Sequence, residues 1–294
     1  MNRRQRRYDD MSFFEIVTQI LRIAVPYLFA AAGGVIAERS GIISLTLEGY
    51  MLGGAFAAVV GTFYSGDPYI GALCGIAGGV ILALIHAIAC IRYRADQVIV
   101  GIAINLFAIG ITRFFLKLLF GSSSNSPRVS GFPAGFGNPL LWLGLLSTPI
   151  VAFILFRTTF GLRVRATGEK PEAAASVGVS VHRVQYTAVL LSGAIAALGG
   201  VYLSLDQHAF TDQMTAGRGF IAVAAVIFGR WSPLRAGAAC LLFAAAETMQ
   251  IHLQGNHLVA SQFIEMIPYV LTIVALAGVV GRAIAPAALG KAEA

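Results

Sequence analysis

YIGALCGIAGGVILALIHAIACI, residues 69–91, is the stretch that decides the fold class of this chain. It contains no Asp, Glu, Lys or Arg, and an α-helix needs about 20 largely apolar residues to cross the hydrocarbon core of a bilayer. Similar stretches recur along the sequence. The candidate spans are residues 13–37, 42–64, 69–91, 98–120, 140–156, 185–205, 220–228, 236–251 and 263–280. We therefore predict an all-α protein, a polytopic transmembrane helical bundle of about 8–10 spans with broken or re-entrant segments.

The segment 220–228 is too short to cross a bilayer alone. Two interpretations remain open: the helix extends through Gly229, Arg230 and Trp231, or it is a half-helix that enters and turns within the protein. Non-helical backbone at membrane depth is tolerated only where protein or a cavity surrounds it.

The composition of the whole chain excludes a soluble fold. Of the 294 residues, 57% are hydrophobic and 12% are charged, and the mean hydropathy is +0.77. Soluble domains carry about 25% charged residues, and one soluble core of this length could not bury so much apolar surface. Membrane lipid is therefore the expected environment. The net charge of +7 comes from basic stretches between apolar segments, which indicates cytoplasmic loops and no nucleic-acid partner.

Basic residues also predict which loops face the cytoplasm. The longest basic loop, residues 157–184, contains Arg157, Arg163, Arg165, Lys170 and Arg183. Two shorter turns, at residues 92–94 and 230–235, carry two arginines each. Single crossings between these points place the C-terminus inside. The loops that fall outside are 121–139, 206–217 and 252–262. The chain then divides into a basic N-terminal tail (1–12), a transmembrane domain (13–284) and a C-terminal tail (285–294).

The side of the N-terminus depends on how residues 13–37 are folded. A single crossing would start outside, whereas the arginines within residues 3–7 favour the cytoplasm. Arg22 interrupts the apolar run, so residues 12–21 could lie along the interface while 24–37 forms a re-entrant half-span. We favour an N-terminus inside.

Small residues recur at every fourth position in two of the spans. This spacing lets helices approach closely in lipid. The glycines predicted to mediate helix packing are Gly49, Gly53, Gly71, Gly75 and Gly79.

Motifs for catalysis and for cofactor binding are absent from the sequence. There is no Gly-x-x-x-x-Gly-Lys-[Ser/Thr] phosphate loop, no His-Glu-x-x-His and no paired-cysteine metal motif. The three cysteines and five histidines are scattered. We expect no catalytic residues, no metal and no cofactor bound by this chain.

Polar residues at membrane depth are informative, because a charge there costs at least ~2.5–3.5 kcal/mol on insertion scales. Glu48 lies inside an apolar run, Asn105 lies near mid-span, and Arg113 lies late in the fourth span. Glu247 and Glu265 lie near span ends. The first three residues either line a hydrated translocation path or brace the bundle interior, for example as a pair of Glu48 with Arg113. Both interpretations make Glu48 face protein rather than lipid.

The basic loop 157–184 carries a short helix signal. Pro171 suits the first helical position, and the negative charge of Glu172 is favourable in a first turn. Ala173 and Ala174 propagate a helix, and Gly178 ends it. Such a helix between two spans can transmit force to a soluble partner. The alternative is a solvated basic linker.

At this loop the sequence resembles the permeases of ABC importers. Glu172, Ala173 and Ala174 followed by Gly178 look like the coupling motif that docks on the ATPase subunit. Further stretches resemble one branch, the permeases for nucleosides and simple sugars, which are related to ribose and branched-chain amino acid permeases. These stretches are ERSGIISLTLEG (38–49), ADQVIVGIAINL (95–106) and GLRVRATGE (161–169).

The resemblance implies the permease subunit of an ATP-driven importer for nucleosides or a related simple sugar, in a bacterial cell (inner) membrane. Residues 13–284 would be the permease domain, with residues 157–184 as its cytoplasmic coupling loop. The implied partners are a second permease subunit, commonly a paralogue, a cytoplasmic ATPase that uses ATP and Mg, and an extracytoplasmic binding protein. The alternative from the residues alone is an ion-coupled secondary transporter or channel in which Glu48 binds the ion.

Overall fold

The structure, a computed structural model, describes residues 13–133, 135–254 and 284–291, and all regular elements in these ranges are helices. The predicted all-α membrane bundle is confirmed. The basic tail 1–12 and the predicted span 263–280, which includes Glu265, lie outside the described residues. The helices are α2 (Phe13–Arg39), α3 (Leu47–Ser65), α4 (Pro68–Ala87), the π-helical turn η1 (Ile88–Arg92), α5 (Gln97–Phe120), the 3-10 turn η2 (Gly135–Gly137), α6 (Pro139–Arg157), α7 (Thr159–Glu169), α8 (Pro171–Ser176), α9 (Val181–Asp206), α10 (Arg218–Phe228) and α11 (Pro233–Gln254).

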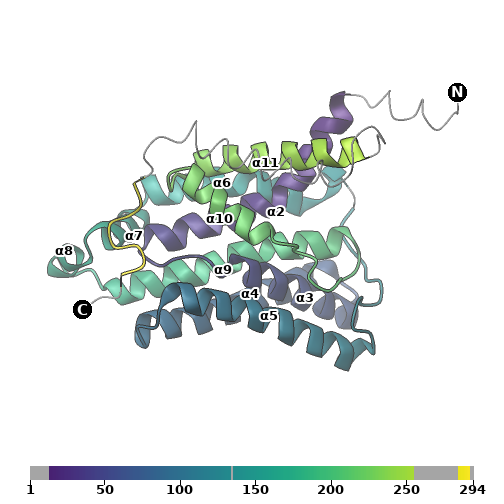
Figure 1. The fold of residues 1–294 in the computed structure, drawn as a ribbon, viewed down its shortest axis with the longest axis horizontal. Coiled ribbons are helices and arrows are strands. Elements are labelled where there is room, and N and C mark those ends of the chain that lie inside the picture. Colours follow the sequence, from purple (N-terminus) through teal and green to yellow (C-terminus); the bar gives the residue numbers. More distant parts are fainter. Residues whose placement is uncertain (1–12, 134, 255–283, 292–294) are drawn as a thin grey trace, which may run out of the picture.

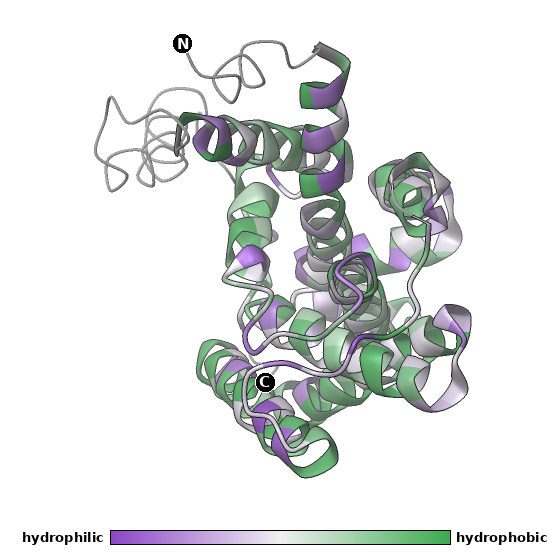
Figure 2. Ribbon diagram, turned by 90° about the vertical axis from the view of Figure 1, so that its right-hand side faces the viewer, coloured by the Kyte–Doolittle hydropathy of each residue, from purple (hydrophilic) through white to green (hydrophobic). Residues whose placement is uncertain are grey.

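Six helices of the described part are long and apolar enough to cross a membrane: α2, α4 with η1, α5, α6, α9 and α11. The central helices are α2 and α9, which pack against each other; α3 and α4 also pack on α9 (Figure 1). On one side α5 covers α3, and on the other α6 and α11 cover α2. Hydrophobic residues run along the lengths of most helices (Figure 2). The least buried of the six spans is α5, whose exposed face carries Ile99, Leu106, Phe114 and Leu118.

Helix ends are set by local capping. The Asp67 carboxylate accepts the Tyr69 N–H at the start of α4, and Asp96 accepts the Val98 N–H at the start of α5. Each satisfies a backbone donor that the first helical turn leaves free. The α3 helix ends at Gly66, whose φ of 76° is left-handed and therefore suits glycine.

The predicted span 42–64 starts later than its hydropathy suggests. Residues 40–46 form a buried, non-helical connection, and α3 begins only at Leu47. Side chains accept backbone N–H groups of this connection: Gln97 Oε1 accepts the Ile43 N–H at 2.7 Å, and Glu38 Oε1 accepts the Ser44 N–H at 3.3 Å. The start at residue 42 was wrong because hydropathy does not detect side chains that replace helical hydrogen bonds.

The first span is one continuous helix, which fits the single crossing and not the alternative of an interfacial segment followed by a half-span. Arg22 does not interrupt α2, because its guanidinium pairs with Asp206 at 3.0 Å. Near its start, Phe14 lies 6.0 Å from the ring of Phe136, whereas Arg39 at its other end contacts Glu169. The start of α2 and the loop 157–184 therefore lie at opposite ends of the bundle (Figure 1).

The glycines predicted to mediate packing lie at helix contacts. A Cβ on Gly53 would lie 2.5 Å from a Leu82 methyl group. Cβ atoms added to Gly71, Gly75 and Gly79 would lie 2.7, 2.8 and 2.6 Å from backbone oxygens of neighbouring helices. Real Cβ atoms essentially never approach so closely, so glycine at these positions allows α3, α4 and α9 to pack tightly.

Candidate functional site

The short helix α10 lies inside the bundle, packed against α2, α3 and α11. Its eleven residues span about 16 Å, roughly half of a hydrocarbon core. The turn of residues 229–232 separates it from α11, which decides between the two interpretations in favour of a half-helix. Both ends of α10 expose backbone groups that need partners inside the protein.

Glu48, in the first turn of α3, supplies the acceptor at the start of α10. One carboxylate oxygen accepts the Thr215 hydroxyl at 2.6 Å and the Gly217 N–H at 2.9 Å, and the other accepts the Gly219 N–H at 2.7 Å. The positive end of the helix dipole favours a negative charge here. A Cβ on Gly219 would lie 2.5 Å from the Glu48 Cα, so glycine permits this close approach. Glu48 is buried and faces protein, as predicted.

Asn105 joins α5 to the start of α3. Its Oδ1 accepts the Gly49 N–H at 2.8 Å, and its Nδ2 donates to the Leu45 carbonyl at 2.8 Å. A Cβ on Gly49 would lie 2.9 Å from Asn105 Oδ1. Asn105 therefore satisfies one donor and one acceptor next to the buried connection 40–46.

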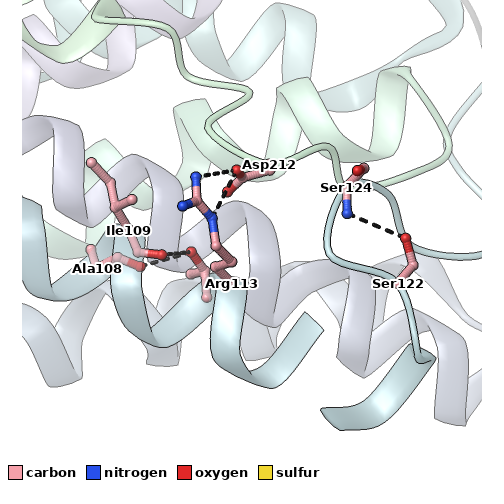
Figure 3. A network of polar contacts seen from close by, with 7 residues as sticks. Ala108, Ile109, Arg113, Ser122, Ser124 and Asp212 are labelled. Atoms are coloured by element: carbon pink, nitrogen blue, oxygen red, sulfur yellow. Dashed lines mark hydrogen bonds and ion pairs between the residues drawn. The ribbon is translucent and has the colours of Figure 1, made fainter. Parts of the chain in front are cut away.

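Arg113 does not contact Glu48, so the pair named as one possible brace of the bundle interior is not formed. The Nε and one terminal nitrogen of Arg113 donate to the same oxygen of Asp212, at 3.0 and 2.5 Å (Figure 3). The Asp212 N–H donates to the Ser124 carbonyl at 2.8 Å. This network connects α5 with the loops that follow it and that precede α10. Arg113 and Lys117 border an open pocket of about 690 Å³ at this end.

A second carboxylate holds the first residue of α10. Arg218 pairs with Glu247 of α11 at 3.1 Å, and Glu247 also accepts the hydroxyl of Tyr27 on α2. Arg218 further donates to the Met214 carbonyl at 3.3 Å. Three helices are thereby joined at the start of α10.

The other end of α10 is held by the last residues of α2. The Trp231 indole N–H donates to Glu38 at 2.5 Å, and the Arg39 Nε donates to the Trp231 carbonyl at 2.8 Å. Arg230 and Trp231 have φ of 51° and 55°, a left-handed turn that non-glycine residues adopt only when surrounding contacts hold it. Glu38 is 3% exposed and accepts three hydrogen bonds, one from Trp231 and two from Ser44.

The loop 157–184 contains the predicted short helix, α8. Pro171 begins it, Glu172 lies in its first turn, and Gly178 beyond its end has a left-handed φ of 83°. Glu172 and Ala173 are exposed, whereas Ala174 packs inward. A groove of about 770 Å³ runs beside α8 and is lined by Lys170, Glu172, Ala173, Gln185, Ala288 and Lys291. Docking of an ATPase at these residues stays a prediction.

The described part of the C-terminal tail, residues 284–291, is attached to this loop. The Ala288 N–H donates to the Gly168 carbonyl at 2.9 Å, and the Gly290 N–H donates to the Gly41 carbonyl at 3.1 Å. The tail, the end of α7 and the start of the connection 40–46 therefore form one layer at this end of the bundle.

Sequence reasoning missed Asp212, Arg218, Tyr27 and Trp231, because none belongs to a recognisable motif. Their partners lie up to 220 positions away, and hydropathy carries no information on such contacts. Among the described residues, no three His, Cys, Asp or Glu side chains lie close enough to hold a metal ion.

Comparison with known proteins decides the family. Residues 16–277 match the family described as the branched-chain amino acid transport system / permease component. The chain belongs to this permease family. It is therefore a multi-pass membrane protein and a transport component rather than an enzyme. The membership supports an ABC-type permease and not an ion-coupled transporter that uses Glu48.

Several curated relatives of this permease carry transport names. The guanosine ABC transporter permease protein NupQ of Bacillus subtilis is 38% identical, over 94% of this chain and 95% of the relative. The nucleoside ABC transporter permease protein NupC of Lactococcus lactis is 35% identical, with the same coverage. A second Bacillus subtilis protein, the guanosine ABC transporter permease protein NupP, is 28% identical over 72% of this chain and 67% of that protein.

A solved structure shares the fold of the permease. It is a metal-chelate type ABC transporter in an inward-facing conformation, with a TM-score of 0.53 and 12% identity, over 88% of this chain and 84% of that one. At this identity the likeness concerns the fold alone.

Proposed function

We propose that this permease is the membrane subunit of a bacterial ATP-driven importer of nucleosides. The observation that carries the proposal is the end-to-end similarity to NupQ and NupC, the first named for guanosine and the second for nucleosides. Purine nucleosides are the first substrates to test. The permease sits in the cell (inner) membrane, and an extracytoplasmic binding protein delivers the substrate.

The coupling loop faces the cytoplasm in this proposal, because its basic residues obey the positive-inside rule. The C-terminal tail lies against it and is on the same side. The opposite end of the bundle then faces outward, with the 121–139 and 206–217 loops and the start of α2. This orientation reverses the predicted inside location for the residues that begin α2.

A separate cytoplasmic ATPase docks at α8 and hydrolyses ATP with Mg, since this chain has no phosphate loop of its own. The support is geometric: Glu172 and Ala173 are exposed beside a groove, on a helix that Pro171 starts and Gly178 ends. Binding of ATP would shift the permease between inward- and outward-facing states.

A second permease subunit, a paralogue, completes the transporter. Bacillus subtilis has two permease proteins named for guanosine, NupQ and NupP, and both resemble this chain. The exposed apolar face of α5 is available for such a subunit or for lipid.

Glu48, Asn105 and Arg113 serve chiefly to brace the bundle in this proposal, rather than to bind substrate. Glu48 and Asn105 are buried and their polar atoms are engaged by protein groups. Arg113, which is half exposed beside the outer pocket, is the one of the three placed to meet a solute.

The test is uptake by the assembled transporter in vesicles, with its ATPase, second permease and binding protein. Radiolabelled guanosine should accumulate with ATP inside and not with ADP, and excess unlabelled adenosine should compete while glucose should not. Uptake of glucose but not guanosine would contradict the nucleoside assignment. Guanosine uptake that needs no ATPase subunit would contradict the ATP-driven mechanism.

A further inference from the structure

The end of α7 and the turn of residues 229–232 that follows α10 are both in contact with one side chain, Arg39. Its Nε donates to the Trp231 carbonyl at 2.8 Å, and its terminal nitrogen lies 3.8 Å from the Glu169 carboxylate. Glu169 is the last residue of α7, and a single residue, Lys170, separates it from the start of α8 at Pro171. The Arg39 side chain is 19% exposed and the Glu169 side chain 52% exposed, so water screens the ion pair more than it screens the Arg39 bond to the Trp231 carbonyl.

Backbone packing at this point is tight. A Cβ on Gly168 would collide with the Arg39 carbonyl and lie 3.3 Å from the Gly41 N. The end of α7 therefore cannot move toward or across residues 39–41 without displacing them. Closely packed elements of this kind change position in discrete steps rather than by continuous deformation.

At its far end, α10 reaches the middle of the bundle, where Glu48 and Arg218 hold it. A displacement of the α10 C-terminal turn would therefore be carried over about 16 Å toward the bundle centre by a rigid helix. The chain of contacts runs from α8 through Glu169, Arg39 and Trp231 to α10.

We infer that Arg39 is a positioning residue that transmits movement of the coupling loop to the half-helix α10. The inference rests on the proposed function, because it takes α8 as the point where the ATPase acts. Arg39 does not contact substrate in this mechanism. It holds the turn after α10 at a fixed position relative to the loop 157–184. Without Arg39, ATP hydrolysis continues but less substrate is imported per ATP hydrolysed.

The experiment measures ATP hydrolysed per guanosine imported by the complete transporter in vesicles. For Arg39→Gln, with assembly and ATP hydrolysis retained, we expect this ratio to rise about fivefold or more, the lower range of typical coupling between sites. Arg39→Lys should be intermediate, because its ammonium can reach Glu169 or the Trp231 carbonyl but lacks the guanidinium geometry to hold both. The control is Arg22→Gln, on the same helix, whose side chain pairs with Asp206 at the opposite end.

An unchanged ratio in Arg39→Gln, including a proportionate loss of hydrolysis and uptake, would overturn the inference. An equal rise in Arg22→Gln would also overturn it, because the effect would then reflect general weakening of α2. If Arg39→Gln does not assemble, Glu169→Gln decides: a rise of about twofold, as for a partly exposed ion pair, supports the link, and no rise overturns it.

Failure of the proposed function would look different. If transport needs no ATPase, no ratio can be defined for any variant. If transport is ATP-driven and Glu172→Lys uncouples the ATPase while Arg39→Gln behaves as wild type, only the role of Arg39 fails.

Discussion

Arg113 and Asp212, 99 positions apart, form an ion pair in which two guanidinium nitrogens donate to one carboxylate oxygen at 3.0 and 2.5 Å. The pair joins α5 to the loop before α10 (Figure 3). It thus links α5 to the loop that leads into α10, the helix that Glu48 caps.

Reversing one charge of this pair should make the loop before α10 more flexible. In Arg113→Glu, two carboxylates would face each other, and we expect protease cleavage within residues 207–217 to increase about two- to fivefold, as for a surface ion pair. The double exchange Arg113→Glu with Asp212→Arg should return cleavage to near the wild-type rate. Equal sensitivity of the single and double variants would show that the pair does not hold the loop.

Glu48→Gln should destabilise the permease and impair uptake. The amide presents one oxygen where the carboxylate accepts from Thr215, Gly217 and Gly219, and its NH₂ group would face an N–H donor. We expect a loss of about 2 kcal/mol, or roughly 4–8 °C in thermal midpoint. The matched control is Asp67→Asn, at an exposed cap where Asn is equally effective. Wild-type melting and uptake in Glu48→Gln would refute the capping role.

Gly79→Ala should weaken the contact between α4 and α9. The new methyl group would lie 2.6 Å from the Gly193 carbonyl oxygen, so the helices must separate, at a cost of about 1–3 kcal/mol. Gly110→Ala is the control: nothing lies within 4 Å of its Cβ position, and alanine favours a helix by up to about 1 kcal/mol. Thermal unfolding in detergent compares the two, and equal midpoints would contradict the packing argument.

Glu172→Lys should reduce ATP-driven uptake by about tenfold or more, because a reversed charge opposes a partner surface that accommodates Glu. Membrane insertion should be unchanged, because Glu172 is exposed and forms no tertiary ion pair among the described residues. The readouts are uptake and co-purification of the ATPase. The control Asp67→Lys makes the same change at the other end of the bundle. Normal uptake with bound ATPase in Glu172→Lys would reject α8 as the docking helix.

Hydropathy and spacing predict much of this fold, since apolar length is what a bilayer selects. The short helix at Pro171 and the packing role of Gly75 were also visible in the sequence, because helix starts and small-residue spacing are local signals.

Long-range polar contacts were not predictable. The Glu48 carboxylate could be recognised as buried, but the groups that donate to it, the backbone N–H groups of residues 217 and 219, have no signature in the sequence. The partner of Arg113 was missed for the same reason: Asp212 lies in a loop, and only the folded chain brings it to α5.

Glu38 and Glu48 are ten positions apart and accept hydrogen bonds at opposite ends of α10. Glu38 accepts the indole N–H of Trp231, just after the helix ends, and Glu48 accepts the Gly219 N–H at its start. The distance spanned by residues 38–48 must therefore match the length of α10, because each carboxylate binds near one end of this helix. Inserting one residue into residues 38–48 or into α10 alone would move one carboxylate away from its hydrogen-bond donors. Matched insertions in both would preserve the contacts at both ends. Natural variation in the two lengths should therefore occur in tandem.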